Sequence, residues 1–246
     1  MISLNNISLV YGGPSDFKAL SNINLDIKRG ESWALIGPSG CGKSSLLFLI
    51  SGLLVPTHGT VSIDNHQVTT PTSDVALILQ DYGLFPWKTV WANVALGLKF
   101  RNYPSTFIKQ KVETVLDSLG LIEFKDKYPN QLSGGQRQRV AIGRALAIDA
   151  NLLLMDEPFS ALDALTRENL QEMVLEIWNK QKATLVFVTH NIEEAVYLGQ
   201  KIAIMTPHPG KIKSVLDNCG AGTTNYRTSP QYHHYCNKVR KILEEQ

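Results

Sequence analysis

The sequence feature that most constrains the fold is the octapeptide from Gly37 to Ser44, Gly-Pro-Ser-Gly-Cys-Gly-Lys-Ser. It fits the G-x-x-x-x-G-K-[ST] pattern of a phosphate-binding loop, in which backbone N–H groups surround phosphate oxygens. Its flanks also fit, because the apolar run 32–36 predicts a buried parallel strand and residues 45–50 predict a packed helix. We therefore predict a strand, a tight turn and a helix whose N-terminus faces an anion.

The side chains of this loop point to a nucleoside triphosphate. Lys43 can reach the β- and γ-phosphates as a point charge, and the Ser44 hydroxyl is placed for Mg²⁺. A glycine-rich turn without a ligand would need neither the lysine nor the hydroxyl. The predicted phosphate-binding residues are Gly37, Pro38, Ser39, Gly40, Cys41, Gly42, Lys43 and Ser44. Because Cys41 lies among loop amides at a helix N-terminus, we expect a lowered thiol pKa, and alkylation that inactivates the protein unless a nucleotide is bound.

The composition limits the kinds of molecule and compartment with which the chain is expected to associate. The 246 residues are 43% hydrophobic and 19% charged, as in an ordinary globular protein, and the net charge of +2 is too small to indicate nucleic acid. The three cysteines are odd in number and far apart, which predicts neither a disulfide framework nor a metal site. No secretory signal and no apolar stretch long enough to span a bilayer is visible, so we expect any membrane association to come through a partner.

Further apolar runs predict the strands of an α/β fold. Residues 2–10 indicate a strand with a turn at Asn5-Asn6, and residues 23–27 indicate an antiparallel partner, joined to it by the loop at Gly12-Gly13-Pro14. Residues 75–79 predict a central strand that ends in Gln80 at the ligand edge of the sheet. Tyr11 closes the first strand, where it could stack on a base or simply be a strand-end tyrosine with a solvated hydroxyl.

A helical insertion is predicted between the two halves of this sheet. Apolar residues recur at helical spacing over residues 90–98 and 108–119. Aromatic residues concentrate over residues 81–101, where they form either core or a docking surface for another protein. They are Tyr82, Phe85, Trp87, Trp91 and Phe100.

A second stretch, Leu132-Ser133-Gly134-Gly135-Gln136, also suits an anion. Ser133 is a good N-cap, and the paired glycines expose backbone N–H groups at the start of a helix. The alternative is a capped surface helix with a solvated basic face. One nucleotide needs only one phosphate cradle, so the residues alone leave the purpose of this second stretch open.

Carboxylates end the next apolar strand, residues 151–155. An aspartate in the position of Asp156, beside a phosphate loop, is what Mg²⁺ coordination requires, and Glu157 could polarise a water molecule. Residues 184–188 predict another strand, which ends in Thr189 and His190 at the same edge. A lone histidine is more often structural, but His190 shares this edge with the other predicted site residues.

The ordered set 37–44, Gln80, 132–136, 152–157, 160–163 and His190 resembles the ATP-binding subunit of an ATP-binding-cassette (ABC) transporter. The Leu-Ser-Gly-Gly-Gln stretch is close to unique to that family, and the match covers residues 2–216. The resemblance implies an α/β fold: a P-loop nucleotide hydrolase core, with a mostly parallel sheet and flanking helices, plus an antiparallel β subdomain and an α-helical subdomain. Residues 1–246 would form one ATP-binding domain, with the helical subdomain at about 84–147 and a C-terminal tail at about 218–246.

The resemblance gives the second stretch a purpose. In this family two subunits pack head to tail, which implies an ATP-dependent homodimer. Ser133, Gly134, Gly135 and Gln136 of one copy would face the γ-phosphate held by the Gly37–Ser44 loop of the other copy. Each ATP would then be bound between two copies of the chain.

The resemblance also implies roles around the phosphates. Lys43 and the loop amides would hold the phosphates, and Ser45 would assist at the α-phosphate. Ser44 and Asp156 would bind Mg²⁺, with Gln80 completing that shell. The implied cofactors are therefore ATP and Mg²⁺.

The remaining implied roles concern hydrolysis and coupling. Glu157 would be the general base, and His190 would contact the γ-phosphate and orient the attacking water. Tyr11 falls where the family stacks an aromatic ring on adenine. Asp163 would lie at the dimer seam, and Gln80 would also connect the site to the helical insertion.

Within the family, residues 84–90, 93–95 and 227–230 resemble the nitrate/sulfonate/taurine import branch. That resemblance implies integral membrane permease subunits and an extracytoplasmic solute-binding protein as partners, a location at the cytoplasmic face of the membrane, and no nucleic acid. Import of a different small solute stays open. A soluble ABC ATPase of DNA repair or chromosome maintenance would carry a long coiled coil, but residues 45–132 contain no heptad run. A small-molecule kinase would not explain residues 132–136.

Overall fold

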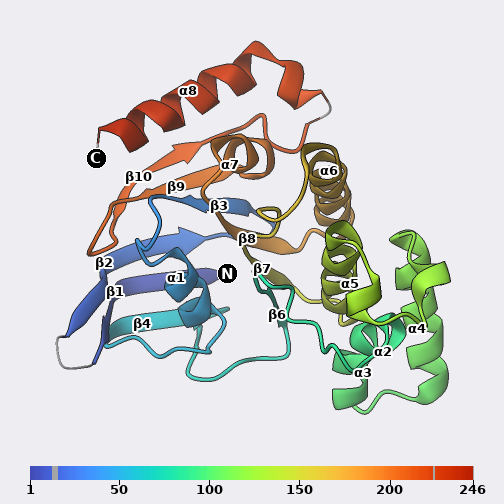
Figure 1. Ribbon diagram of the computed structural model, residues 1–246. Coiled ribbons are helices and arrows are strands. Elements are labelled where there is room, and N and C mark those ends of the chain that lie inside the picture. The colour runs from blue at the N-terminus through green and yellow to red at the C-terminus, as the bar shows by residue number, and fades with distance from the viewer. Residues whose placement is uncertain (13–15, 224, 246) are drawn as a thin grey trace.

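Two sheets organise the chain, which a computed structural model describes over residues 1–12, 16–223 and 225–245 (Figure 1). Within these residues the larger sheet has six strands in the order β10-β9-β3-β8-β7-β6. Its neighbours are parallel except for β10, which runs antiparallel to β9. The strands are β3 (Ser32–Ile36), β6 (Val75–Ile78), β7 (Leu152–Asp156), β8 (Thr184–Thr189), β9 (Lys201–Met205) and β10 (Ile212–Asp217). The mostly parallel sheet confirms the predicted fold class.

The smaller sheet is antiparallel, with the order β2-β1-β4-β5. Its strands are β1 (Ile2–Tyr11), β2 (Phe17–Ile27), β4 (His58–Ile63) and β5 (His66–Gln67). The predicted pairing of the first two strands is confirmed, but the expected turn at Asn5-Asn6 is wrong. β1 continues through these residues with a shift in register between Leu4 and Ile7, and Asn6 has a φ of 52°. Of the predicted connecting loop, Gly13 and Pro14 lie outside the described residues.

The larger sheet is buried on both faces, which explains its continuous apolar runs. Helix α1 (Lys43–Ile50) and the smaller sheet cover one face, on which Trp33 and Leu35 of β3 lie. The alternate residues of β3, Ala34 and Ile36, join the core on the other face. That core includes helices α5 (Gly134–Ala147), α6 (Ala164–Gln181) and α7 (Ile192–Leu198). Because the strands from β9 to β6 are parallel, their carboxyl ends lie at one edge of this buried sheet.

The helical insertion follows β6, and two details differ from expectation. The predicted helix over 90–98 is divided into α2 (Val90–Val94) and α3 (Leu96–Phe100), and α4 (Ser105–Ser118) follows. Two short 3-10 helices, Ile122–Phe124 and Pro129–Gln131, lead to α5. The strand predicted to be central, β6, is at the edge of the sheet beside β7, and it alternates half-buried and buried residues. In Figure 1 the insertion extends to one side of the sheet beyond this edge.

The aromatic residues of the insertion divide between the two predicted roles. Tyr82 and Trp91 pack against the core, whereas the side chains of Trp87 and Phe100 are 70% and 79% exposed. The core interpretation is confirmed for Tyr82 and Trp91, and the docking-surface interpretation stays a prediction for the two exposed rings. Neither exposed ring belongs to the hydrophobic core clusters formed by the described residues.

The C-terminal tail lies along α7 and β9 (Figure 1). A short 3-10 helix, Tyr226–Thr228, precedes α8 (Pro230–Glu244), whose N-cap is Ser229. Tyr232 and Val239 of α8 are buried in the core on this face of the larger sheet. No helix in the described parts of the chain combines the length and apolar character needed to cross a bilayer.

Candidate functional site

An open cavity of about 670 Å³ lies at the carboxyl edge of the larger sheet. It brings together residues from β1, the loop before α1, the end of β6, and the loops after β7 and β8. The predicted site residues that line it are Tyr11, Ser39, Gly40, Gly42, Lys43, Ser44, Ser45, Gln80, Glu157 and His190. Residues spread over most of the sequence therefore share one cavity.

The loop before α1 curls as its glycines predict. Gly40 and Gly42 have φ values of 76° and 92°, which only glycine adopts without strain. Lys43 is 6% exposed, and its Nζ donates to the carbonyl oxygens of Gly37 and Pro38 over 2.9 and 2.8 Å. The ammonium group is therefore held inside the loop, at the positive N-terminal end of α1, where an anion is favoured.

A hydroxyl and a carboxylate meet behind this loop. Ser44 Oγ donates to Asp156 Oδ1 over 2.9 Å, and the Asp156 side chain is buried at the end of β7. Burial raises the pKa of this carboxyl and the nearby charge of Glu157 raises it further, whereas the Ser44 hydrogen bond and Lys43 oppose the shift. This oxygen pair suits Mg²⁺, which typically takes one or two protein ligands and completes its octahedron with water and phosphate.

Glu157 and His190 both line the cavity, and their side chains are in contact. Glu157 Oε2 is 3.2 Å from His190 Nδ1, and the two side chains come from the loops after β7 and β8. The backbone of Glu157 has a φ of 45°, which is uncommon for a residue with a Cβ, and its N–H donates to the carbonyl of Val188 over 3.0 Å. The Glu157 carboxylate is therefore positioned by a strained turn, which this backbone hydrogen bond attaches to the neighbouring strand β8.

Two aromatic rings, those of Tyr11 and Phe17, also line the cavity. The Tyr11 hydroxyl is 3.0 Å from Ser45 Oγ, while the exposed Phe17 is its partner in the β1–β2 register. Phe17 also packs edge-on against His208, with ring centroids 4.9 Å apart. Sequence reasoning selected Tyr11 and missed Phe17, because the register of the hairpin could not be read across its connecting loop.

Other predicted residues lie outside the cavity. Ser133 caps α5: its hydroxyl accepts from the Gln136 N–H over 3.3 Å, and Gln136 Oε1 accepts from the Ser133 N–H over 2.9 Å. Ser133, Gly134, Gly135 and Gln136 do not line the cavity formed by the described part of the same chain. The two segments of one chain that are predicted to bind an anion are therefore separate.

Cys41 corrects one prediction from the sequence. Its side chain is 1% exposed, and burial raises the thiol pKa, although Lys43 and local hydrogen bonds oppose the shift. The expected lowering of the pKa is wrong, because the sequence shows the helix N-terminus but not the packing around the sulfur. Three further residues of the loop do not line the cavity: Gly37, Pro38 and Cys41. The carbonyl oxygens of Gly37 and Pro38 instead accept hydrogen bonds from Lys43.

Comparison with known proteins gives matches along most of the chain. Residues 20–160 match the protein family described as ABC transporter. An aliphatic sulfonates import ATP-binding protein of Bacillus cereus is 44% identical over 218 residues, which are 88% of this chain and 86% of that protein. A taurine import ATP-binding protein of Roseobacter denitrificans is 42% identical over 213 residues, 86% of this chain and 80% of that protein.

A solved structure agrees with these matches. It is the dimeric structure of an ATP-binding cassette in a post-hydrolysis state, bound to ADP and Pi. It superimposes with a TM-score of 0.79 at 34% identity, covering 88% of this chain and 98% of the other. The chain is thus similar in sequence and in fold to ATP-binding cassettes.

Proposed function

The chain belongs to the ABC transporter family, as its motifs indicate, and from this premise we propose that it is the ATP-hydrolysing subunit of a nitrate/sulfonate/taurine-type importer. The observation that carries the proposal is the shared cavity, in which a lysine, a hydroxyl, a glutamate and a histidine meet at one sheet edge. The relatives named for sulfonate and taurine import support the solute class.

The proposed mechanism is positioning and charge stabilisation around the phosphates. Lys43 and the N-terminus of α1 hold the phosphates, while Ser44 and Asp156, with Gln80, hold Mg²⁺. Held by these residues, the metal ion would supply positive charge at the phosphate oxygens. Ser45 would contact the α-phosphate and Tyr11 would stack on adenine, which their place in the cavity lining supports.

In the same proposal Glu157 is the general base and His190 orients the water that attacks the γ-phosphate. The 3.2 Å contact between the two side chains supports this assignment, because it places an acceptor and a second polar group on the same side of the cavity. His190 holds Glu157 in one orientation, and Glu157 accepts the proton of the water.

ATP is bound between two copies of the chain in this proposal. The Gly37–Ser44 loop of one copy and residues Ser133–Gln136 of the other contact the same nucleotide. Within one chain the Gly37–Ser44 loop and residues Ser133–Gln136 lie apart, which supports a nucleotide site shared between two copies. The similar dimeric cassette, which is bound to ADP and Pi, also supports it. Asp163, at the N-cap of α6, lies at the seam and couples the two sites.

The proposed partners are permease subunits in the membrane and an extracytoplasmic solute-binding protein, which places the chain at the cytoplasmic face of the membrane. The helical insertion, about residues 84–147 of the single domain 1–246, is the docking surface, and exposed Trp87 and Phe100 support this. Asn93 fixes the preceding loop by accepting from the Phe85 N–H over 2.9 Å and donating to three carbonyls, including those of Lys88 and Thr89. The tail, about residues 218–246, remains part of the same domain.

The proposal is tested by measuring ATP hydrolysis as a function of protein concentration, with and without DNA. We expect turnover per chain to rise with concentration, because two copies form each site, and DNA to have no effect. Stimulation by DNA, or full turnover by a strict monomer, would contradict the proposal. Reconstitution with permease subunits and stimulation by taurine or an alkyl sulfonate would test the solute class.

A further inference from the structure

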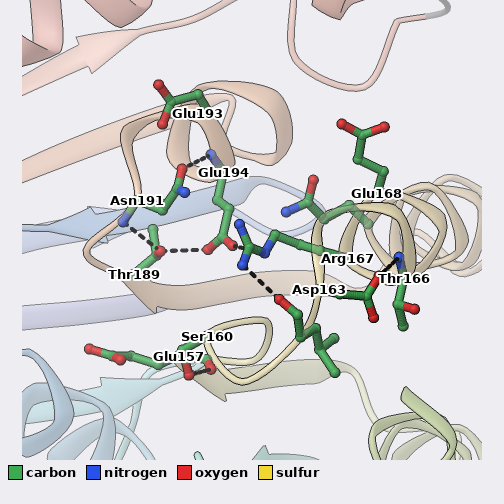
Figure 2. A network of polar contacts seen from close by, with 12 residues as sticks. Glu157, Ser160, Asp163, Thr166, Arg167, Glu168, Thr189, Asn191, Glu193 and Glu194 are labelled. Atoms are coloured by element: carbon green, nitrogen blue, oxygen red, sulfur yellow. Dashed lines mark hydrogen bonds and ion pairs between the residues drawn. The ribbon is translucent and has the colours of Figure 1, made fainter. Parts of the chain in front are cut away.

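A partly buried ion pair joins α6 to α7 and has no part in the mechanism above (Figure 2). Arg167 of α6 and Glu194 of α7 approach to 3.7 Å between Nε and Oε1, and the Glu194 side chain is only 5% exposed. Burial raises the pKa of Glu194, while Thr189 and Arg167 oppose the shift. Taking two charges out of water is costly, and an apolar pair of similar volume often gives equal or greater stability. The ion pair is therefore a weak stabiliser, and its contacts need another explanation.

Glu194 is bonded to the loop that carries His190. Thr189, the last residue of β8, donates from its hydroxyl to Glu194 Oε2 over 2.6 Å. The same hydroxyl accepts from the Asn191 N–H over 3.0 Å, and Asn191 Oδ1 accepts from the Glu194 N–H over 3.0 Å. His190 lies between two residues that are both fixed through Glu194, so its backbone has little freedom to shift.

Arg167 is bonded to the loop that carries Glu157. Its Nη2 donates to the carbonyl of Leu162 over 2.7 Å. At the other end of this loop, Ser160 Oγ donates to the carbonyl of Glu157 over 3.0 Å. The turn after β7 is therefore held near its start by its own side chain and near its end by Arg167, as Figure 2 shows.

These contacts form a closed ring of interactions that includes the proposed catalytic pair, Glu157 and His190. The ring runs from Glu157 to His190, through Thr189 to Glu194, across the ion pair to Arg167, and back through the turn after β7. The ion pair is the part of the ring that joins α6 to α7. Its removal would open the ring and leave the two loops joined by the Glu157–His190 contact and by the backbone hydrogen bond from Glu157 to Val188.

We propose that Arg167 and Glu194 are positioning residues that set the distance between Glu157 and His190 for hydrolysis. The inference rests on the function proposed above, because it assigns the ring to the step in which water attacks the γ-phosphate. Most of the proposed contacts with ATP lie outside the ring, since the phosphate loop lies between β3 and α1, and Lys43 and Ser44 begin α1. The ion pair should therefore affect kcat without affecting the affinity for ATP.

The test compares Glu194→Gln, Arg167→Met and the double variant with the wild-type protein, all as the full chain. Because small misplacement of reacting groups is costly, we expect each single change to lower kcat by roughly 10- to 100-fold. The Kd of ATP, measured by calorimetry, should stay within about twofold of wild type. The double variant should be no slower than the slower single variant, because both changes break the same link.

Arg227→Met is the matched control. Arg227 also joins α6 to α7: its Nη1 is 3.4 Å from Glu168 Oε1, and its guanidinium lies 3.8 Å from the Tyr197 ring centroid. It is not part of the ring, so Arg227→Met should lower the melting temperature and leave kcat unchanged. If Arg227→Met lowers kcat as much as Glu194→Gln, general loosening of the two helices is the cause and the proposal is wrong.

Glu194→Gln is nearly isosteric, so it serves as the decisive variant if Arg167→Met does not fold. Wild-type turnover by Glu194→Gln, or a rise in the Kd of ATP that matches the loss in kcat, would overturn the inference. If the wild-type protein hydrolyses ATP and its turnover per chain rises with protein concentration, either of these results would leave the proposed function intact. Absence of ATP hydrolysis by the wild-type protein would instead contradict the proposed function.

Discussion

Ser44 and Asp156 are 112 positions apart in the sequence, and the hydroxyl of one donates to the carboxylate of the other over 2.9 Å. The contact follows from the order of the sheet, in which β3 and β7 flank β8. Because these strands are parallel, the residues that follow their carboxyl ends meet at one edge. The burial that positions Asp156 also makes its ionised form costly, which gives a first prediction.

Asp156→Asn should stabilise the nucleotide-free protein at neutral pH while abolishing Mg²⁺-dependent hydrolysis of ATP. The folded-state pKa of Asp156 is raised above 3.8 by burial, so the folded protein holds this proton more tightly than the unfolded chain. By linkage, every tenfold gain in proton affinity costs about 1.4 kcal/mol of stability once the pH is above the folded pKa. Asparagine removes that cost but also removes the carboxylate proposed to bind the metal.

The stability part of this prediction has a definite dependence on pH. The cost is absent below 3.8 and grows as the pH rises from there through the folded pKa, so the two proteins should differ least at the acid end. Thermal unfolding of both proteins without nucleotide, over a series of pH values, measures the difference. A variant that is less stable than wild type at every pH would contradict the assigned cause of the raised pKa.

Glu157→Gln should keep ATP binding and lose hydrolysis. The amide preserves the size of the side chain and can still contact His190, but it cannot accept a proton from water. ATP should then hold two copies together, which gel filtration with ATP and with ADP would detect. Normal turnover by this variant would show that the base is another group. Glu176→Gln, in an exposed pair with Lys180 on α6, is a control expected to behave as wild type.

Cys41 should react slowly with alkylating reagents in the folded protein. It is buried with a raised thiol pKa, whereas Cys219 is exposed. Mass spectrometry of the native protein treated with iodoacetamide should therefore find Cys219 modified first, with little loss of ATPase activity. Rapid modification of Cys41 that ATP prevents would restore the expectation drawn from the sequence.

The features predicted correctly are those whose chemistry is local. The turn at Gly40 and Gly42 needs glycine whatever surrounds it, and Ser133 caps α5 through residues within one turn. Features that depend on the packing of distant segments were not predictable. The raised pKa of Cys41 and the edge position of β6 both result from neighbours that local spacing does not reveal. The place of Phe17 in the cavity is a further example.

Arg167 and Glu194 show the same limit within the site. Each belongs to an ordinary helical pattern, and their contact needs α6 and α7 to lie together. A sequence signal exists only for the neighbouring caps, because Asp163 and Asn191 are typical N-cap residues. The caps predict where the helices begin, but they do not predict that side chains of both helices join two loops.

Gly135→Ala should destabilise the protein because of a contact on the side of α5 that faces α6. A Cβ at this position would lie 2.5 Å from Thr166 Cγ2, well inside van der Waals contact. Overpacking of this kind typically costs about 1–3 kcal/mol, against about 1 kcal/mol gained from the helix preference of alanine. We therefore expect a lower melting temperature and weaker ATP hydrolysis, since α5 carries Ser133 at its N-terminus.

Thr166→Ser supplies the control for this prediction, because serine lacks the methyl group that alanine would strike and keeps the N–H that donates to Asp163. Thr166→Ser alone should be close to wild type, and Gly135→Ala combined with Thr166→Ser should recover both the melting temperature and hydrolysis. Recovery of the melting temperature without hydrolysis would mean that the glycine is required at the nucleotide of the partner copy. The double variant thus separates a packing requirement within one chain from a contact between two chains.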